Sequence, residues 1–384
     1  PTSNWNYPTS VRFGVGRISE LPDACRSVNI SRPLLVTDPG LAALPMIADA
    51  ITALQAAGLS TTVFSDIQAN PVAANVDTGV GAFRSGEHDG VIAWGGGSAM
   101  DAAKAIAFMA GQSRPIWDFE DIGDNWTRAD ATGICPIIAV PTTSGTGSEV
   151  GRASVITNED THTKKIIFHP KMLPEIVICD PALVAGLPSN LTAWTGMDAL
   201  AHCLEAFCAP GYHPMADGIA VEGLRLVKDW LPKAVADGAD LEARAHMMSA
   251  AAMGATAFQK GLGAIHSLSH PVGSIYNAHH GLANAVFTPY VLVHNRTAIE
   301  DRMARLARWL DFSGNGFDAI LDWTLELRRT FDIPHTADAL GVENDRLPEL
   351  AQMAAEDPTA GSNPIAVDAG AMLAMYRASI AGEL

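Results

Sequence analysis

Acidic and imidazole side chains recur at helical spacing in the second half of the chain. Asp198 and His202 lie four residues apart, His266 and His270 repeat that interval, and His280 follows ten residues later. Residues at i and i+4 share one face of a helix. One carboxylate with several imidazoles suits a divalent transition metal. The pattern therefore predicts a metal site, although the spacing alone leaves open which three histidines are ligands.

The segment 261–295 contains no Asp, Glu, Lys or Arg, yet it holds five of the twelve histidines. A transmembrane helix needs about 20 predominantly apolar residues, whereas this segment also contains two prolines and three asparagines. We expect a buried polar segment and not a membrane span. A lone histidine is usually an ordinary core or surface residue, but several together in an uncharged segment favour metal binding.

A glycine turn, Gly95-Gly96-Gly97-Ser98, stands directly between an apolar strand-like run and a helical run. Residues without Cβ let backbone N–H groups approach a phosphate, and a helix N-terminus adds positive potential. A tight turn without any ligand is the alternative, because the run is not the usual GxGxxG fingerprint.

Two further loops suit the same kind of ligand. Residues 141–148 (PTTSGTGS) follow another buried run and offer hydroxyl groups and glycines for a diphosphate or ribose. Asp38 ends the run 32–38, where a carboxylate can accept both ribose hydroxyls and would repel a 2′-phosphate. Asp38-Pro39-Gly40 is also a plain turn sequence. Together the three loops predict a dinucleotide, NAD in preference to NADP.

A dinucleotide half and a metal half together suggest hydride transfer assisted by a metal. A cation polarises an alcohol or carbonyl oxygen as a Lewis acid, and a nicotinamide gives or takes the hydride. No cysteine or serine nucleophile is required.

The elements that must position these residues change in type near residue 187. Before it, strand-like and helical runs alternate, which predicts a mostly parallel sheet covered by helices. After it the pattern is helical, and Ser189 or Asn190 could cap the first helix. We therefore expect an α/β dinucleotide-binding domain over 1–186 and an all-α metal and catalytic domain over 187–384. The expected strands are 32–38, 60–67, 90–98, 134–143 and 175–181, and the expected helices of the first half are 44–58, 76–89 and 99–111.

Composition narrows the class of protein. The 384 residues carry a formal net charge of −17, and 48% of them are hydrophobic. This hydrophobic content argues against disorder, and the acidic balance argues against a nucleic-acid partner. The five cysteines are scattered without a CxxC pair, and the N-terminal residues lack the pattern of a signal peptide. We expect a reduced, cytoplasmic protein with no membrane partner.

At these residues the sequence strongly resembles the iron-containing (group III) alcohol dehydrogenase family. The matching segments are GGGSAMDAAKA (95–105), PTTSGTGSEV (141–150), GMDALAHCLEAF (196–207) and HSLSHPVGSIYNAHHGLANAV (266–286). The resemblance implies a small alcohol or aldehyde substrate, NAD, a divalent metal (Fe²⁺ before Zn²⁺), an active site in a cleft between the two domains, and a homodimer or larger homo-oligomer.

The resemblance also assigns residues by position. It implies the metal ligands Asp198, His202, His266 and His280, with His280 preferred over its neighbour His279. It makes His270 a catalytic or proton-relay residue near the substrate. The implied cofactor contacts are Asp38, Asn70, Gly96, Gly97, Ser98, Asp101, Thr142, Thr143, Lys164 and Leu183, with Lys164 preferred over Lys165.

Two departures from the family pattern concern the substrate more than the reaction. Relatives often carry a Cys and an Arg in a D..C..NPR pattern, whereas residues 357–365 here read DPTAGSNPI. Gln259 and Lys260 replace a stretch that more often contains Asn.

Two other classes of function share parts of the pattern. A lyase resembling dehydroquinate synthase would use NAD and a metal without net redox change, but it generally binds metal through a Glu and two His and carries basic residues for a charged substrate. The uncharged segment 261–295 favours a neutral substrate instead. The remaining alternative is a non-catalytic nucleotide- or metal-binding protein. A broad screen of alcohols and aldehydes without any change in NADH absorbance would favour it.

Overall fold

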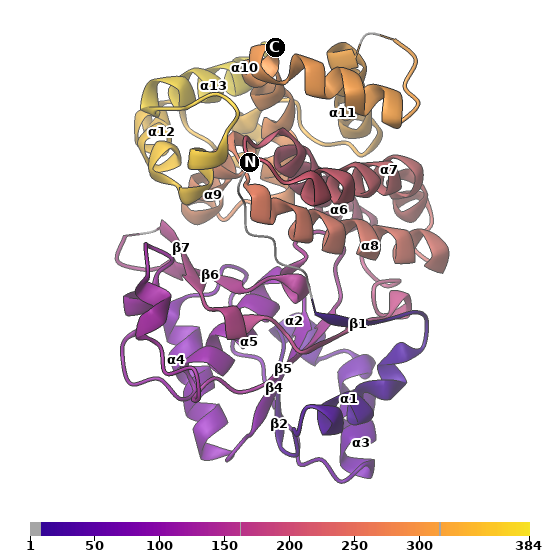
Figure 1. The fold of residues 1–384 in the computed structure, drawn as a ribbon, viewed down its shortest axis with the longest axis vertical. Helices are drawn as coiled ribbons and strands as arrows, with labels where there is room; N and C mark the ends of the chain where they lie inside the picture. Colours follow the sequence, from indigo (N-terminus) through magenta and orange to yellow (C-terminus); the bar gives the residue numbers. More distant parts are fainter. Residues whose placement is uncertain (1–8, 162, 315) are drawn as a thin grey trace. The chain divides into compact units, whose positions relative to one another are not determined.

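The computed structural model describes residues 9–161, 163–314 and 316–384. These residues form two compact units, an α/β unit that ends at Leu187 and a helical unit from Pro188 to Leu384. Figure 1 shows strands in the first unit, whereas the described regular elements of the second are all helices. The expected fold class, an α/β half followed by an all-α half, is confirmed.

The α/β unit is built on a six-stranded sheet in the order β1-β8-β5-β4-β2-β3, and every pairing in it is parallel. Its strands are β1 (Ser10–Phe13), β2 (Pro33–Val36), β3 (Thr62–Phe64), β4 (Gly90–Gly95), β5 (Ile137–Pro141) and β8 (Ile176–Cys179). Its α-helices are α1 (Leu21–Ser27), α2 (Pro39–Ala42), α3 (Pro45–Ala56), α4 (Ala73–Ser85) and α5 (Gly97–Met109). Its 3₁₀ helices are 17–20, 116–119, 125–128, 148–150, 170–172 and 181–183.

The central strands are apolar along their whole length because helices cover both faces of the sheet. Leu35, Trp94 and Ile138 belong to a buried cluster with residues of α1 and α3 on one face. Side chains alternate along a strand, so Leu34 and Ala93, which are equally buried, point to the other face. Figure 1 shows α4 and α5 on that side. This double covering explains why these strands read as continuous hydrophobic runs.

The order of the strands reverses between β2 and β4. From β2 the chain moves outward to β3, and it then returns to place β4 on the other side of β2. Open α/β sheets bind ligands at such a reversal, outside the carboxyl ends of the strands. Asp38 follows β2, and the glycine turn follows β4.

Three strands lie outside the five runs that were predicted as strands. β1 is only four residues long and pairs with β8 at the edge of the sheet. β6 (Ala153–Asn158) and β7 (Thr163–Phe168) form an antiparallel pair separate from the main sheet. These two strands are rich in polar residues and lack the apolar run on which the other strand predictions rested.

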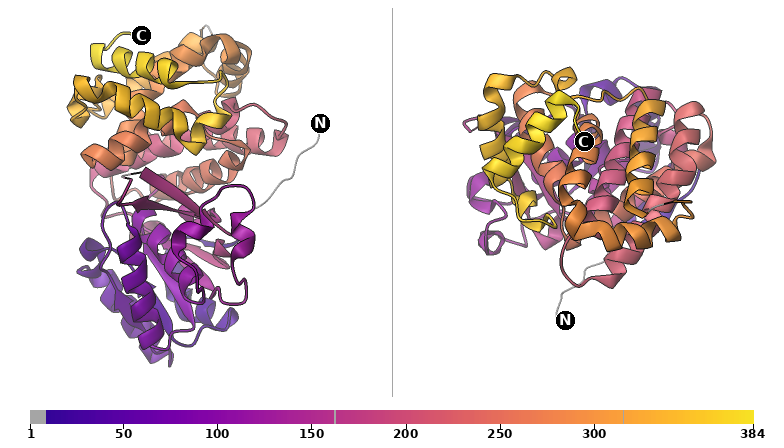
Figure 2. Two further views of the ribbon diagram at one scale, coloured as in Figure 1. Left: turned by 90° about the vertical axis from the view of Figure 1, so that its left-hand side faces the viewer. Right: turned by 90° about the horizontal axis from the view of Figure 1, so that it is seen from above.

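The helices of the second unit pack around one large apolar core. Its α-helices are α6 (Ser189–Cys208), α7 (Pro214–Ala236), α8 (Leu241–Ala257), α9 (Ala264–Tyr276), α10 (His280–Trp309), α11 (Gly316–Thr330), α12 (Leu347–Glu356) and α13 (Ala369–Ala381). Its 3₁₀ helices are 258–260, 337–340, 344–346 and 358–362. Helix α6 packs against α7, α8 and α10, and α9 packs against α10 and α12. The views in Figure 2 show these helices around a common interior.

Two expectations for this unit have clear outcomes. Ser189 and Asn190 were candidate caps of the first helix, but α6 begins at Ser189 and its N-cap position is Pro188, with no side-chain cap. That prediction was wrong. The segment 261–295 becomes α9 and the first half of α10, and most of its residues are buried. Among the described residues, no helix combines the length and the apolar character needed to cross a bilayer.

Candidate metal centre and cofactor site

Three helices of the helical unit bring four donor side chains to one point. Helix α6 presents Asp198 and His202 one turn apart, α9 presents His266 in its first turn, and α10 begins with His280. One possible ligand atom from each residue lies within 4.8 Å of the others. Three of the four side chains are almost fully buried, and the His280 side chain is 31% exposed.

The separations between donor atoms match those around a shared cation. The Nε2 atoms of His202 and His266 each lie 3.8 Å from Oδ1 of Asp198, and Nε2 of His280 lies 3.5 Å from it. Ligands about 2.1 Å from a tetrahedral ion are roughly 3.4 Å apart. The donor set, one carboxylate and three imidazoles, is also of the type that first-row divalent metals accept.

Asn284 lies against the same atoms. Its Nδ2 donates to Asp198 Oδ1 at 2.7 Å and stands 3.2 Å from His266 Nε2 and 3.1 Å from His280 Nε2. An amide nitrogen has two hydrogens, so it cannot satisfy three acceptors. Its own Oδ1 is buried without a hydrogen-bond partner among the described residues. More potential acceptors therefore face this nitrogen than it has hydrogens, and the residues present fit a bound cation.

The carboxylates around His266 make the local electrostatic potential negative. Burial lowers the pKa of His266, but the carboxylates of Glu205 and Asp198 more than offset this, and the pKa of His266 is raised above its ordinary value. The same carboxylates that favour a proton on this imidazole would favour a metal cation in its place.

Two further histidines of the segment, His270 and His279, lie beside the donor group and are not part of it. The His270 ring stacks on the His280 ring with 5.4 Å between centroids, and its Nδ1 donates to Asp357 Oδ2 at 2.7 Å. His279 occupies the N-cap position of α10 and packs against Trp194. The structure thus places His280, and not His279, among the converging donors.

Sequence reasoning missed Glu205 and Asp357. Glu205 contacts His266, and Asp357 contacts His270. Glu205 follows Asp198 by seven residues, which places it on the same helix face, and that spacing was a usable signal. Asp357 is 87 residues from His270, and no local pattern connects them.

Most of the predicted cofactor residues follow the carboxyl ends of strands of the parallel sheet, whereas Lys164 lies in the separate β6–β7 pair. The glycine turn links β4 to α5, and Gly95 has a φ of +148°. A Cβ on Gly95 would stand 2.7 Å from the Cβ of Ala99, so this position requires glycine. Gly96 and Gly97 face Thr143 and Thr146 of the neighbouring loop, which leaves no room for larger side chains between the two loops.

Asp38 lies at the same edge and also has a structural role. Its Oδ1 accepts the backbone N–H of Leu41 at 2.9 Å and caps the short helix α2. Its Oδ2 lies toward Gly95, 3.7 Å from where a Cβ of that residue would stand. The turn interpretation and the ribose interpretation are therefore compatible, since they use different oxygens.

Several other predicted contacts are engaged in holding the loops together. The Ser98 hydroxyl donates to Ala69 O, next to Asn70. Asp101 accepts the Ser148 hydroxyl at 2.5 Å and Val155 N at 2.9 Å, which ties the 141–150 loop to α5. Thr142 and Thr143 follow directly on β5, Leu183 ends a 3₁₀ helix after β8, and Lys164 lies in β7, opposite Thr157.

The residues that depart from the family pattern have structural partners. Lys260 donates to Phe207 O at 3.2 Å, near the end of α6, and pairs with Asp217 at 2.5 Å. A cation at the C-terminal end of a helix satisfies orphan carbonyls and the helix dipole. The Asp357 that begins the divergent segment accepts the Thr359 hydroxyl at 2.5 Å in addition to His270.

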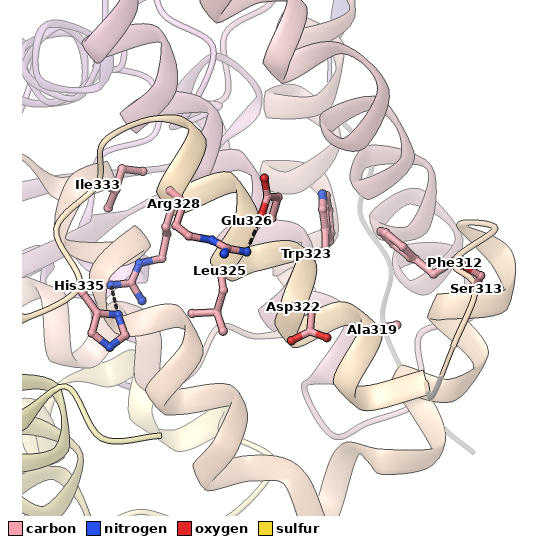
Figure 3. A pocket seen from close by; sticks show the side chains of 11 residues that line it. Phe312, Ser313, Ala319, Asp322, Trp323, Leu325, Glu326, Arg328, Ile333 and His335 are labelled. Carbon is pink, nitrogen blue, oxygen red and sulfur yellow. Dashed lines mark hydrogen bonds and ion pairs between the residues drawn. The ribbon is translucent and has the colours of Figure 1, made fainter.

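A separate cavity of about 860 Å³ lies beside α11 and is shown in Figure 3. Trp323, Arg328 and His335 line it, and none of the predicted site residues does. Arg328 donates to the carbonyl of Pro334 at 2.6 Å and lies near His335. We assign no role in the reaction to this cavity.

Comparisons with known proteins agree with the fold. The family model of iron-containing alcohol dehydrogenase matches residues 8–181, and that of the C-terminal region of the Fe-containing alcohol dehydrogenase family matches residues 192–380. The 4-hydroxybutyrate dehydrogenase of Cupriavidus necator is 41% identical over 371 residues, which cover 93% of this chain and 94% of that protein. The NAD-dependent methanol dehydrogenase of Bacillus methanolicus is 34% identical over 369 residues, covering 94% and 96%.

A solved structure of 1,3-propanediol oxidoreductase has a TM-score of 0.94 and 32% identity, and the match covers 99% of this chain and 100% of that one. Fold, donor set and relatives together define a metal-dependent oxidoreductase. The chain belongs to the iron-containing alcohol dehydrogenase family. The alternative of a lyase related to dehydroquinate synthase finds no support in these comparisons.

Proposed function

We propose that this enzyme transfers hydride between NAD(H) and a small alcohol or aldehyde, with a divalent metal, Fe²⁺, held by Asp198, His202, His266 and His280. The observation that carries the proposal is the convergence of these four donors within 4.8 Å. Donor chemistry alone would also accept zinc, manganese or cobalt, and the family gives the preference for iron.

Under this proposal, each unit has a separate binding function. Residues 1–186 bind the dinucleotide, and residues 187–384 hold the metal. The proposed contacts with the cofactor are the residues named above at the carboxyl edge of the sheet. Lys164 in β7 and Leu183 after β8 complete the set. Asp38 accepts the ribose hydroxyls and excludes a 2′-phosphate, which makes NAD the cofactor.

The chain's own side chains prepare the site for the reaction. A divalent cation held by the four donors supplies Lewis-acid polarisation of the substrate oxygen. Asp357 accepts a hydrogen bond from the Nδ1–H of His270, which leaves Nε2 of that ring as the atom able to take or give the proton of the substrate. Burial of the donors excludes water and strengthens these electrostatic interactions.

The substrate that the residues favour is small and neutral. The segment 261–295 contributes two of the proposed ligands and His270, and it has no Lys or Arg to bind an anion. The names of the relatives include methanol and 1,3-propanediol dehydrogenases, whose named substrates are neutral, and a 4-hydroxybutyrate dehydrogenase, whose named substrate carries a carboxylate. These three alcohols and their aldehydes form the first screening panel, which tests the preference for a neutral substrate.

The test is a metal-defined assay with matched variants. The apoprotein is reloaded with Fe²⁺ or Zn²⁺, and NADH formation is followed with the panel. We expect Asp198→Ala and His266→Ala to lose bound metal and turnover while circular dichroism stays native. His279→Ala, which alters the neighbouring histidine outside the donor group, should keep its metal. Retained metal and turnover in both ligand variants would refute the ligand assignment.

We also propose a cytoplasmic homo-oligomer. The five cysteines are free thiols, as expected in a reducing compartment. Strand β1 is an edge strand on which Val11 and Phe13 are 42% and 39% exposed, and exposed apolar edges favour pairing with another chain. Light scattering of the native enzyme and of a Val11→Lys variant tests whether this edge supports association.

A further inference from the structure

Glu205 lies behind the proposed ligands and contacts one of them directly. It stands on α6, on the helix face that carries Asp198 and His202, and is 6% exposed. Among the described residues, each of its carboxylate oxygens has one hydrogen-bond partner. Oε2 is 2.6 Å from His266 Nδ1, and Oε1 accepts the backbone N–H of Ile265 at 2.7 Å.

These contacts determine which nitrogen of His266 carries the proton. A carboxylate only accepts hydrogen bonds, so Nδ1 of His266 must be the N–H. In the neutral ring, the other nitrogen, Nε2, then has a lone pair. The position of Asn284 agrees, because its Nδ2, which can only donate, lies 3.2 Å from that Nε2. The ring therefore presents its lone pair toward Asp198 and His280.

We infer that Glu205 is the positioning residue that holds His266 in the tautomer needed for metal binding; this inference rests on the proposed function. A carboxylate behind a ligating histidine fixes the ring and raises its basicity. Glu205 lies on α6, the helix that also carries the proposed ligands Asp198 and His202. Helix α6 therefore supplies two ligands and, through Glu205, holds a third, His266.

The same carboxylate also anchors the start of α9. The first N–H groups of a helix have no partner within it. Here the N–H of Ala264 donates to Asn363 Oδ1 at 3.1 Å, and the N–H of Ile265 donates to Glu205. Glu205 thus sets the position of the helix that carries His266 as well as the protonation of the ring.

A neutral amide of the same shape cannot perform both tasks. If Glu205→Gln keeps its oxygen on Ile265 N–H, its NH₂ group faces Nδ1 of His266. The ring must then accept at Nδ1 and carry its proton on Nε2, the atom assigned to the metal. If the amide turns round, the oxygen serves His266 and the NH₂ group opposes Ile265 N–H. Either the tautomer of His266 needed for the metal or the contact with Ile265 N–H is therefore lost.

The experiment compares full-length apoproteins of wild type, Glu205→Gln and Asn363→Ala. Affinity is measured by Co²⁺ titration with a competing chelator, and the Co²⁺ absorption spectrum reports the ligand set. We expect Glu205→Gln to bind Co²⁺ about 10- to 100-fold more weakly, with an altered spectrum. Asn363→Ala, which removes the neighbouring cap and leaves Glu205 in place, should lower the melting temperature of the apoprotein but keep the affinity within about threefold of wild type.

A second measurement separates this inference from the proposed function. Nitrogen-15 NMR of the metal-free wild-type protein, labelled at histidine and held near pH 9, reports the tautomer of each neutral ring. We expect His266 to be protonated at Nδ1 only. Protonation at Nε2, or Co²⁺ affinity equal to wild type in Glu205→Gln, would overturn the role of Glu205. Failure of the wild type to bind any divalent metal would instead overturn the proposed function, and the NMR result would still decide the tautomer.

Discussion

His270 donates from Nδ1 to Oδ2 of Asp357 across 2.7 Å, and this bond joins α9 to the segment that precedes α13. The pKa of Asp357 is lowered, because His270 and Thr359 more than offset the effect of burial. The carboxylate is therefore ionised and holds the imidazole in one orientation, with Nε2 left to exchange a proton.

Asp357→Asn tests this relationship. Asp357 accepts from Thr359 with Oδ1 and from His270 with Oδ2. An asparagine has only one acceptor oxygen and cannot keep both sets of contacts. We expect kcat to fall about 100-fold, the lower end of the range for a general acid–base group, with little change in metal content. Thr359→Ala is the control, because it removes the hydroxyl bond and leaves the His270 contact. Equal kcat in wild type and Asp357→Asn would show that His270 needs no such partner.

The sequence predicted the parts of this protein that rest on local periodicity. Runs such as 134–143 read as strands because both faces are buried, and Asp198 with His202 read as one helix face because the interval is a helical turn. The same rule did not predict β1, β6 and β7, because many of their side chains are polar or partly exposed and give no continuous apolar run. Only their hydrogen-bonded pairing with neighbouring strands identifies them as strands.

What the sequence could not predict are the contacts between distant segments. Asp357 and Asn363 belong to a stretch that reads as a divergent loop, yet they hold His270 and the start of α9. Tertiary packing creates these contacts, and no spacing rule connects residues so far apart. Glu205 is intermediate, since helical spacing places it on the right face but does not show that it contacts His266.

Cofactor choice is predicted to depend on the charge of Asp38 and not on its role as a cap. Asp38→Asn keeps an oxygen that can accept the Leu41 N–H and removes only the negative charge. Relief of repulsion worth about 1–4 kcal/mol should raise the ratio of kcat/KM for NADP⁺ over NAD⁺ at least about fivefold. Both cofactors are compared by steady-state kinetics at one ionic strength. An unchanged ratio would mean that Asp38 does not face the 2′ position.

The glycine turn is predicted to be sensitive to a single methyl group. Gly95→Ala places a Cβ 2.7 Å from that of Ala99 on a backbone with φ of +148°, so the loop must shift. We expect a loss of about 1–3 kcal/mol in stability and weaker NADH binding. Gly81→Ala in α4 meets nothing within 4 Å and should raise stability by up to about 1 kcal/mol. Thermal melts and NADH fluorescence titrations compare the pair, and equal behaviour would contradict the steric argument.

The stability of the α/β unit is predicted to fall as pH rises, because of Glu149. This residue is 2% exposed, and burial raises its pKa from 4.5 to about 7, against the opposing effects of its backbone hydrogen bond and Lys104. A carboxyl whose folded pKa is raised binds its proton more tightly when folded, so its contribution is full below about pH 4.5 and is lost as pH rises through about 7.

At about 1.4 kcal/mol for each pH unit of the shift, the loss amounts to about 3 kcal/mol between these limits. Glu149→Gln cannot ionise, so its melting temperature should decline less than that of wild type between pH 5 and about pH 8. Glu159→Gln alters an exposed carboxyl on the same unit and should follow the wild-type curve. Parallel curves for wild type and Glu149→Gln would show that Glu149 is ionised in the folded protein throughout this range, with Lys104 able to stabilise its charge.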